Sequence, residues 1–153
     1  ALSDLCAISV GTGPGNFTGI RISVSAARGL ALSLRIPAIG VSRLEAMAFG
    51  TSGAQTAIID ARQNRIYAQT FQNGTSVSDI AIIEQADYSA DQPTLCDAPI
   101  ALPATMITTQ ICLANAAQIA ATRMTTDQPK PAPLYVRAPD AALPSDPPPV
   151  ILP

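Results

Sequence analysis

The most informative stretch of this 153-residue sequence is Gly11-Thr12-Gly13-Pro14-Gly15-Asn16-Phe17-Thr18-Gly19-Ile20-Arg21. It follows an apolar segment, Leu5 to Val10, of the kind that forms a buried parallel strand. The residues after it repeat with the period of a helix, which Pro37 brings to an end. The stretch therefore predicts a strand, a glycine-rich turn and a helix in succession.

A glycine-rich turn before a helix has two readings. Its backbone amides can hold a phosphate, or the glycines can let the helix pack closely on the sheet. A P-loop is excluded because Ile20 and Arg21, not Lys and Ser or Thr, follow Gly19, and the dinucleotide fingerprint fails because position 16 is Asn. Both readings therefore stay open for the turn residues Gly11, Gly13, Pro14, Gly15, Asn16 and Gly19.

The helix after the turn has two faces of different character. Its expected buried face consists of Ile20, Val24, Ala27, Ala31 and Leu34, spaced by four and three residues. A second face carries arginines every seven residues at positions 21, 28 and 35. These arginines either form a solvated surface or bind an acidic helix of a partner protein, and the sequence alone favours neither.

The rest of the chain divides by pattern into further parts. Residues 38–41 predict a second strand, and Ser42 with Glu45 predicts a capping box at the start of a short helix. Residues 1–52 are thus expected to form part of a first lobe, with a parallel sheet. Beyond them the period changes to that of antiparallel hairpins, with strands expected over 56–60, 66–72 and 77–84 and a turn at Asn73-Gly74. This second lobe is expected to span residues 53–104, although 87–103 give no clear pattern.

Residues 105–124 predict an alanine-rich helix that returns to the first lobe, with Ile107, Ile111, Ala114 and Ala117 on one side. The proline-rich residues 125–153 cannot form a regular helix or a central strand. We expect them to form an extended strap, attached through Leu134, Tyr135 and Val136.

The composition limits the kinds of catalytic, metal and nucleic-acid-binding site that the chain can form. The chain contains no histidine and a single lysine, Lys130, so Ser-His and Cys-His nucleophile pairs and histidine-ligated zinc are absent. The formal net charge of −2 and the lack of a basic cluster argue against tight direct binding to nucleic acid. Three widely spaced cysteines indicate buried thiols in a reducing cytoplasm, and no apolar run is long enough for a membrane span.

The glycine stretch also closely resembles the signature of the bacterial TsaB (YeaZ) family, Gly-x-Gly-Pro-Gly-Ser-Phe-Thr-Gly-Leu-Arg, with Asn16 in place of Ser. Ile59-Asp60-Ala61-Arg62 resembles the family's Asp-Ala-Arg hairpin, and Pro133 to Arg137 resembles its C-terminal Pro-x-Tyr-Leu-Arg strap. The similarity extends from residue 1 to about 141. These motifs identify the chain as a member of that family.

The resemblance implies an α/β, actin/Hsp70-like two-lobed fold. It also implies a non-catalytic, glycoprotease-like subunit in tRNA threonylcarbamoyladenosine biosynthesis, with no catalytic residue, metal or cofactor of its own and a nucleotide only at a site shared with a partner. The partners implied are a TsaD-like catalytic subunit, a TsaE-like ATPase within the complex, and tRNA indirectly, with a homodimer as an alternative. The interface candidates are Phe17, Thr18, Arg21, Val24, Ser25, Arg28 and Leu32.

The resemblance assigns structural roles to four further residues. Asp60 and Arg62 are expected to hold the hairpin, through an ion pair between them, and Tyr135 and Arg137 are expected to fasten the strap. Compared with the family, we expect this chain to lack the first lobe's N-terminal strands and a loop near residues 95–105. The competing hypotheses are an actin-like ATPase and a glycoprotease-like peptidase.

Overall fold

The computed structural model describes residues 1–136, which form a mixed α/β fold. After a short 3-10 helix, η1 (Leu2–Asp4), the glycine turn joins strand β1 (Ile8–Gly11) to helix α1 (Phe17–Leu34). The predicted strand, turn and helix are confirmed, although the strand begins at Ile8 and not at Leu5. Strand β2 (Ala38–Val41) lies at the predicted residues and pairs in parallel with β1.

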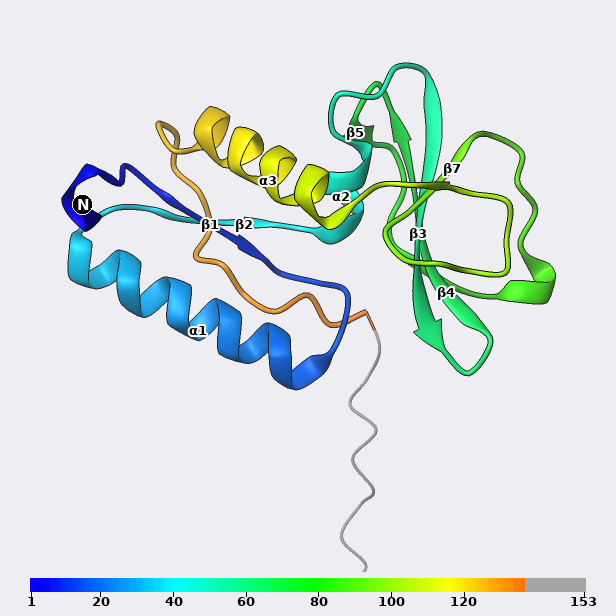
Figure 1. Cartoon of the computed structure of the whole chain (residues 1–153), viewed down its shortest axis with the longest axis horizontal. Coiled ribbons are helices and arrows are strands. Elements are labelled where there is room, and N and C mark those ends of the chain that lie inside the picture. Colours follow the sequence, from blue (N-terminus) through cyan, green and yellow to red (C-terminus); the bar gives the residue numbers. More distant parts are fainter. Residues whose placement is uncertain (137–153) are drawn as a thin grey trace, which may run out of the picture.

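The two-stranded sheet lies between two helices, α1 and α3 (Thr109–Arg123) (Figure 1). On one face, Val10 of β1 packs with Val24 and Ala27 of α1. On the other face, Ile119 of α3 packs in the cluster that includes the side chains of β2. Short parallel sheets depend on such cover on both faces, because their strands are apolar on both sides.

Helix α2 (Arg43–Ala48) is capped by Ser42, whose hydroxyl accepts a hydrogen bond from the Glu45 amide at 3.0 Å. Only this half of the predicted capping box forms. The Glu45 carboxylate instead makes an ion pair with Arg123 at the end of α3. The long-range charge partner therefore competes successfully with the local amide.

A second sheet follows, in which β3 (Ala54–Arg62) and β4 (Arg65–Gln72) form a long antiparallel hairpin. The Asp60 carboxylate accepts a hydrogen bond from the backbone N–H of Arg62 at 2.8 Å. The expected Asp60–Arg62 ion pair is therefore replaced by a contact to the main chain, which shapes the turn. Residues 62–64 all have positive φ there.

Of the segment expected to form one strand over 77–84, only Ala81–Glu84 forms a strand, and a separate short strand precedes it. The predicted turn at Asn73-Gly74 is confirmed, with φ of 51° and 76°, and it connects β4 to β5 (Thr75–Ser76). The chain then leaves the sheet and returns as β6 (Ala81–Glu84), which pairs with another part of β4. A short 3-10 helix, η2 (Gln85–Asp87), follows.

Two parallel strands complete the second sheet, which the sequence predicts as antiparallel only. β7 (Thr94–Cys96) pairs with β3, and β8 (Thr105–Met106) pairs with β7. The order is β5-β4-β3-β7-β8, with β6 beside β4. Because β8 takes residues 105 and 106, the last helix starts at Thr109 and not at Thr105.

Helix α2 is shared by the cores of both sheets. Leu44 and Met47 pack with Ile59 and Phe71 of the second sheet, while Ala46 packs with the β2 and α3 side chains of the first. The opposite face of the second sheet is covered by side chains from residues 88–104. Helix α2 thus connects the two sheets, and Cys112 of α3 also packs against both clusters.

The side of α3 that packs inward is not the side that carries Ile111, Ala114 and Ala117. Ile111, Ala114 and Ala117 are exposed, whereas the residues that turn inward are Cys112, Ala116, Ile119 and Ala120. Alanines occupy both sides of this helix, so its sequence period cannot distinguish them. The sheet and α2 select the side that packs.

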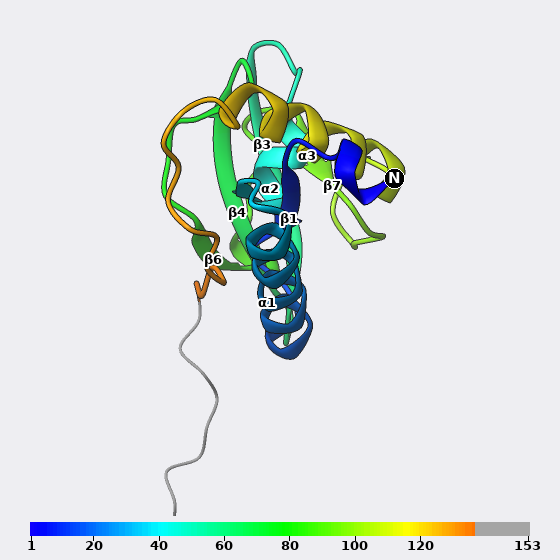
Figure 2. The same ribbon diagram turned by 90° about the vertical axis from the view of Figure 1, so that its left-hand side faces the viewer.

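Between α3 and Val136 the chain runs as an extended strap, as predicted for this part of it (Figure 2). In this view the strap runs along one side of the two-stranded sheet, and the N-terminus lies on the other side. The Leu134 amide donates to the Thr12 carbonyl at 2.8 Å, and Pro131 lies against Gly40. Arg137, expected to help fasten the strap, lies outside the described residues.

Candidate functional site

The glycine turn is held by backbone hydrogen bonds to the residues around the end of β2. The Thr12 amide donates to the Val41 carbonyl at 2.9 Å, and the Arg43 amide donates to the Gly13 carbonyl at 2.8 Å. Gly13 has φ of 104°, and a Cβ built there would lie 2.7 Å from the Ile20 Cδ1. Glycine is therefore required at this position for its backbone conformation and for the close approach of α1.

Arg43 occupies the space beside the rest of the turn. Its Nη1 donates to the Pro14 carbonyl at 3.1 Å and would lie 3.0 Å from a Cβ at Gly15. Its Nε and Nη2 donate to one oxygen of Asp97, just beyond β7. Both residues are missing from the sequence-based prediction of the site, because no local pattern relates positions that lie 54 residues apart.

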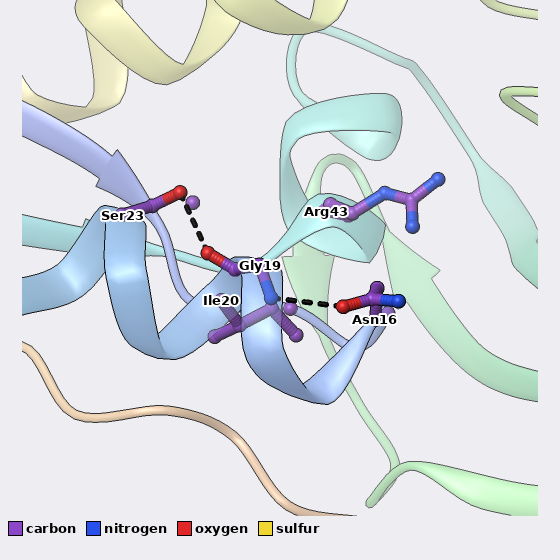
Figure 3. Close-up of a pocket in the computed structure, with 8 residues that line it drawn as sticks. Asn16, Gly19, Ile20, Ser23 and Arg43 are labelled. Atoms are coloured by element: carbon purple, nitrogen blue, oxygen red, sulfur yellow. Dashed lines mark hydrogen bonds between the residues drawn. The ribbon is translucent and has the colours of Figure 1, made fainter.

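A pocket of about 200 Å³ opens at the turn (Figure 3). Asn16, Ile20 and Ser23 line it from one side, and Arg43 lines it from α2. The volume is below the roughly 300–1,000 Å³ typical of small-molecule sites. Of the glycine amides at this turn, that of Gly19 donates to a side chain, the Asn16 oxygen.

Asn16 is the N-cap of α1, and its side-chain oxygen accepts a hydrogen bond from the Gly19 amide at 2.8 Å. One of the free amides that a phosphate would use is therefore already satisfied. Asn is as effective an N-cap as the Ser of the family signature. The substitution at position 16 therefore preserves the cap of α1.

Helix α1 presents a broad exposed surface. Only Val24, Ala27 and Ala31 are buried along its 18 residues. The interface prediction for Val24 is therefore wrong, since its side chain is 2% exposed in the core with Val10. The outward side of the helix, here called the α1 outer face, is exposed and uncharged and consists of Thr18, Ile22, Ser25, Ala26, Gly29, Leu32 and Ser33.

The strap and α1 meet at an exposed cluster of three side chains. The Phe17 and Tyr135 rings stack with centroids 4.9 Å apart. The Arg21 guanidinium lies 4.2 Å from the Phe17 ring centroid, and its Nε donates to the Tyr135 hydroxyl at 2.7 Å. The structure thus brings Tyr135, which is expected to fasten the strap, together with two of the interface candidates.

Arg28 lies two turns further along α1 than Arg21, and Arg35 is the C-cap residue just after the helix; both are exposed. Within residues 1–136 the ion pairs join Ala1 to Asp4, Arg43 to Asp97, and Arg123 to Glu45. No carboxylate in this part of the chain therefore pairs with Arg21, Arg28 or Arg35.

The described residues offer little for metal or thiol chemistry. Among them, no three His, Cys, Asp or Glu side chains lie close enough to hold a metal ion. Burial raises the pKa of the Cys96 and Cys112 thiols, which keeps both in the neutral form. Cys6 is exposed.

A family model described as "TsaD: tRNA N6-adenosine threonylcarbamoyltransferase" matches residues 1–99. The Escherichia coli "tRNA threonylcarbamoyladenosine biosynthesis protein TsaB" is 46% identical over 77 residues, which cover 47% of this chain and 33% of that protein. The chain belongs to the TsaB (YeaZ) family. An uncharacterized protein of Mycobacterium bovis is 32% identical over 147 residues, or 92% of this chain and 68% of that one.

A solved structure with the same arrangement is a Pseudomonas aeruginosa protein described as similar to the peptidase YEAZ. Its TM-score is 0.66 at 26% identity, over 90% of this chain and 76% of that one. The match to the E. coli TsaB protein spans about a third of that protein's length. Across residues 1–136, no helix is both long enough and apolar enough to cross a membrane.

Proposed function

We propose that this chain is a non-catalytic scaffold subunit in the synthesis of threonylcarbamoyladenosine on tRNA, and that it binds a TsaD-like catalytic subunit through α1. The family relationship supports the pathway, and the uncharged α1 outer face supports the mode of action. A TsaE-like ATPase would join through the complex. The tRNA would be contacted mainly by the partner, since this chain has a net charge of −2.

The α1 outer face is the observation that carries the proposal. A solvent-facing helix side normally bears charged residues, yet the seven residues of this face have none. Ser25, Ala26 and Gly29 are small, so the axis of a second helix can approach to within the usual 8–10 Å. Such a surface favours a packed partner helix over water.

The turn and the composition support a subunit without its own active site. The chain has no histidine, and Ile20 and Arg43 leave a pocket of only about 200 Å³ beside the glycines. We propose that the chain binds no cofactor by itself and that any nucleotide lies at a site shared with the partner. The proposal includes an actin/Hsp70-like two-lobed architecture, which the two separate sheets support.

A matched pair of variants tests the interface. Ala26→Arg places a long charged side chain on the α1 outer face, and Ala117→Arg makes the same change on the exposed side of α3. We expect Ala26→Arg to weaken binding to the TsaD-like subunit of the same genome by about 100-fold or more, measured by calorimetry. We expect Ala117→Arg to bind like the parent. Equal affinities for both variants would contradict the proposal.

Reconstituted tRNA modification tests the function itself. Omission of this chain is expected to abolish product formation by the TsaD-like subunit, and Ala26→Arg is expected to restore little of it. Full activity without this chain would exclude the scaffold role. Sedimentation of the chain alone would show whether a homodimer uses the same face, since Ala26→Arg would then dissociate it.

The alternative is an enzyme, which the peptidase description of the Pseudomonas structure favours. A peptidase of this chain would need a nucleophile without histidine assistance, and an ATPase would need a phosphate cradle at the glycine turn. Titration of ATP into the isolated chain and a peptide-hydrolysis assay distinguish these activities from a scaffold. Micromolar ATP binding, or hydrolysis that survives rigorous purification, would favour the enzyme.

A further inference from the structure

Arg21 has an unusually well-defined position for an exposed arginine. Its guanidinium carbon lies 4.2 Å from the Phe17 ring centroid and 5.7 Å from that of Tyr135, and its Nε donates to the Tyr135 hydroxyl. Arginine loses substantial side-chain entropy when it is fixed in one geometry. Here the strap and the first turn of α1 have already fixed it, so a ligand of Arg21 would not bear that cost.

The same guanidinium lacks a carboxylate partner within residues 1–136. Its Nε is engaged by Tyr135, and its two terminal nitrogens are the groups that bind a carboxylate in a bidentate manner. By contrast, Arg43 and Arg123 both have such partners inside the chain. Arg21 therefore presents an oriented and unsatisfied cation at the edge of the α1 outer face.

Arg28 extends this cation into a row along α1, and Arg35 follows as the C-cap residue of the helix, with φ of 56°. Residues seven apart on a helix lie about 10.5 Å apart along its axis, on nearly the same side. Arg21 and Arg28 each have a neighbour four residues further on in the α1 outer face, Ser25 and Leu32. Helix α1 carries no acidic residue, so nothing on the helix itself neutralises the row.

We infer that Tyr135 positions Arg21 to bind a carboxylate on a helix of the partner subunit, so that the strap forms part of the partner-binding surface. The inference rests on the proposed function, because the partner is the one that packs on the α1 outer face. A helix packed at a small angle to α1 faces the row at seven-residue intervals, which suits acidic side chains with the same repeat. Charge complementarity thus selects a helix with regularly spaced Asp or Glu residues.

RNA is the alternative polyanionic partner for such a row. The observations favour protein, because the row has only three cations and the chain as a whole is acidic. Proteins that bind RNA phosphates usually carry a broader basic surface. The uncharged outer face beside the row also suits a packed helix better than a phosphate backbone.

A double-mutant cycle tests the inference. The full 153-residue chain is titrated into the TsaD-like subunit as the parent, Tyr135→Phe, Arg21→Ala and the double variant, at two salt concentrations. Tyr135→Phe keeps the stacked ring and removes only the oxygen that accepts from Arg21. We expect about tenfold weaker binding for Arg21→Ala, about threefold for Tyr135→Phe, and no further loss in the double variant.

Salt dependence separates this role from a merely structural one. Arg21→Ala and Tyr135→Phe should both reduce the change in affinity between low and high salt, because each weakens one charge contact. Tyr88→Phe is the matched control, since it removes a hydroxyl that bonds to Thr94 in the second sheet. Tyr88→Phe should leave affinity and salt dependence unchanged, and thermal unfolding should confirm that all variants fold.

The outcomes distinguish a failure of the inference about Arg21 from a failure of the proposed function. Additive losses in the double variant, or parental affinity for Arg21→Ala, would overturn the inference while the proposed function stands. A parent chain that fails to bind the TsaD-like subunit would overturn the proposed function. If Arg21→Ala lowers only the affinity of the assembled complex for tRNA, the row contacts RNA and the inference is wrong.

Discussion

The Arg43 side chain donates its Nε–H to the Asp97 Oδ2 at 2.9 Å, across 54 residues of sequence. Arg43 belongs to α2 and also bonds to the Pro14 carbonyl of the glycine turn, whereas Asp97 directly follows β7. The Asp97 side chain is 11% exposed and that of Arg43 is 41% exposed. This one ion pair therefore connects the turn that starts α1 to the second sheet.

Removal of Arg43 should lower the stability of the fold more than removal of Asp97. Arg43→Ala leaves a largely buried carboxylate without its partner, and we expect the free energy of unfolding to fall by about 2–3 kcal/mol. Asp97→Ala should cost about 1 kcal/mol, since the freed guanidinium can turn toward solvent. Urea unfolding measures both, with the exposed Asp79→Ala as a control expected to change little. A larger loss for Asp97→Ala would contradict this assignment of burial.

Two glycines of the same stretch should respond oppositely to alanine. Gly13 has a positive φ, and a Cβ there would collide with Ile20, so we expect Gly13→Ala to lower the free energy of unfolding by about 2 kcal/mol or more. Gly29 lies inside α1, with open space around its missing Cβ. Gly29→Ala should therefore raise stability by about 0.5–1 kcal/mol. Thermal or urea unfolding of both variants gives the comparison, and equal signs would show that the turn geometry is wrong.

Local signals in the sequence were sufficient for much of the fold. The strand, turn and helix around residues 8–34, the second strand at 38–41 and the turn at Asn73-Gly74 are all where the pattern predicts them. Each depends on neighbours within a few residues: a cap, a breaker or a residue that tolerates positive φ. The predicted strap is also found, because prolines exclude the alternatives.

Features that depend on distant contacts could not be predicted. Strands β7 and β8 have three and two residues, and only pairing with β3 makes them strands. Val24 was assigned to the partner surface by similarity, although its spacing already placed it on the buried face. No sequence pattern indicated that Tyr135 would meet Arg21 across 114 positions. Most contacts of the candidate site therefore join residues that are far apart in the sequence, and only the folded structure shows them.

Position 16, the N-cap of α1, should tolerate only residues whose side chain can accept a hydrogen bond from the Gly19 amide. Asn16→Ala removes that acceptor and should lower the free energy of unfolding by about 1 kcal/mol. Asn16→Ser restores a capping oxygen and should be within a few tenths of a kcal/mol of the parent. Urea unfolding of the two variants measures the difference. Similar losses for Ala and Ser would mean that another group caps the helix.

The buried thiols should make stability fall at high pH. Burial raises the pKa of Cys96 and of Cys112 above the ordinary value of 9.0. Above about pH 9 the unfolded chain therefore releases thiol protons that the folded chain retains, which favours unfolding. The contribution of these thiols is fully present below pH 9 and is lost as the pH rises through their folded values. The slope can reach about 1.4 kcal/mol per pH unit for each thiol.

Urea unfolding between pH 8 and pH 10.5 measures this slope in the parent and in a Cys96→Ala/Cys112→Ala variant. The variant starts from a lower stability because it loses core contacts, so the slopes and not the absolute values are compared. If the double variant loses stability with pH as steeply as the parent, the two buried thiols are not the groups that titrate.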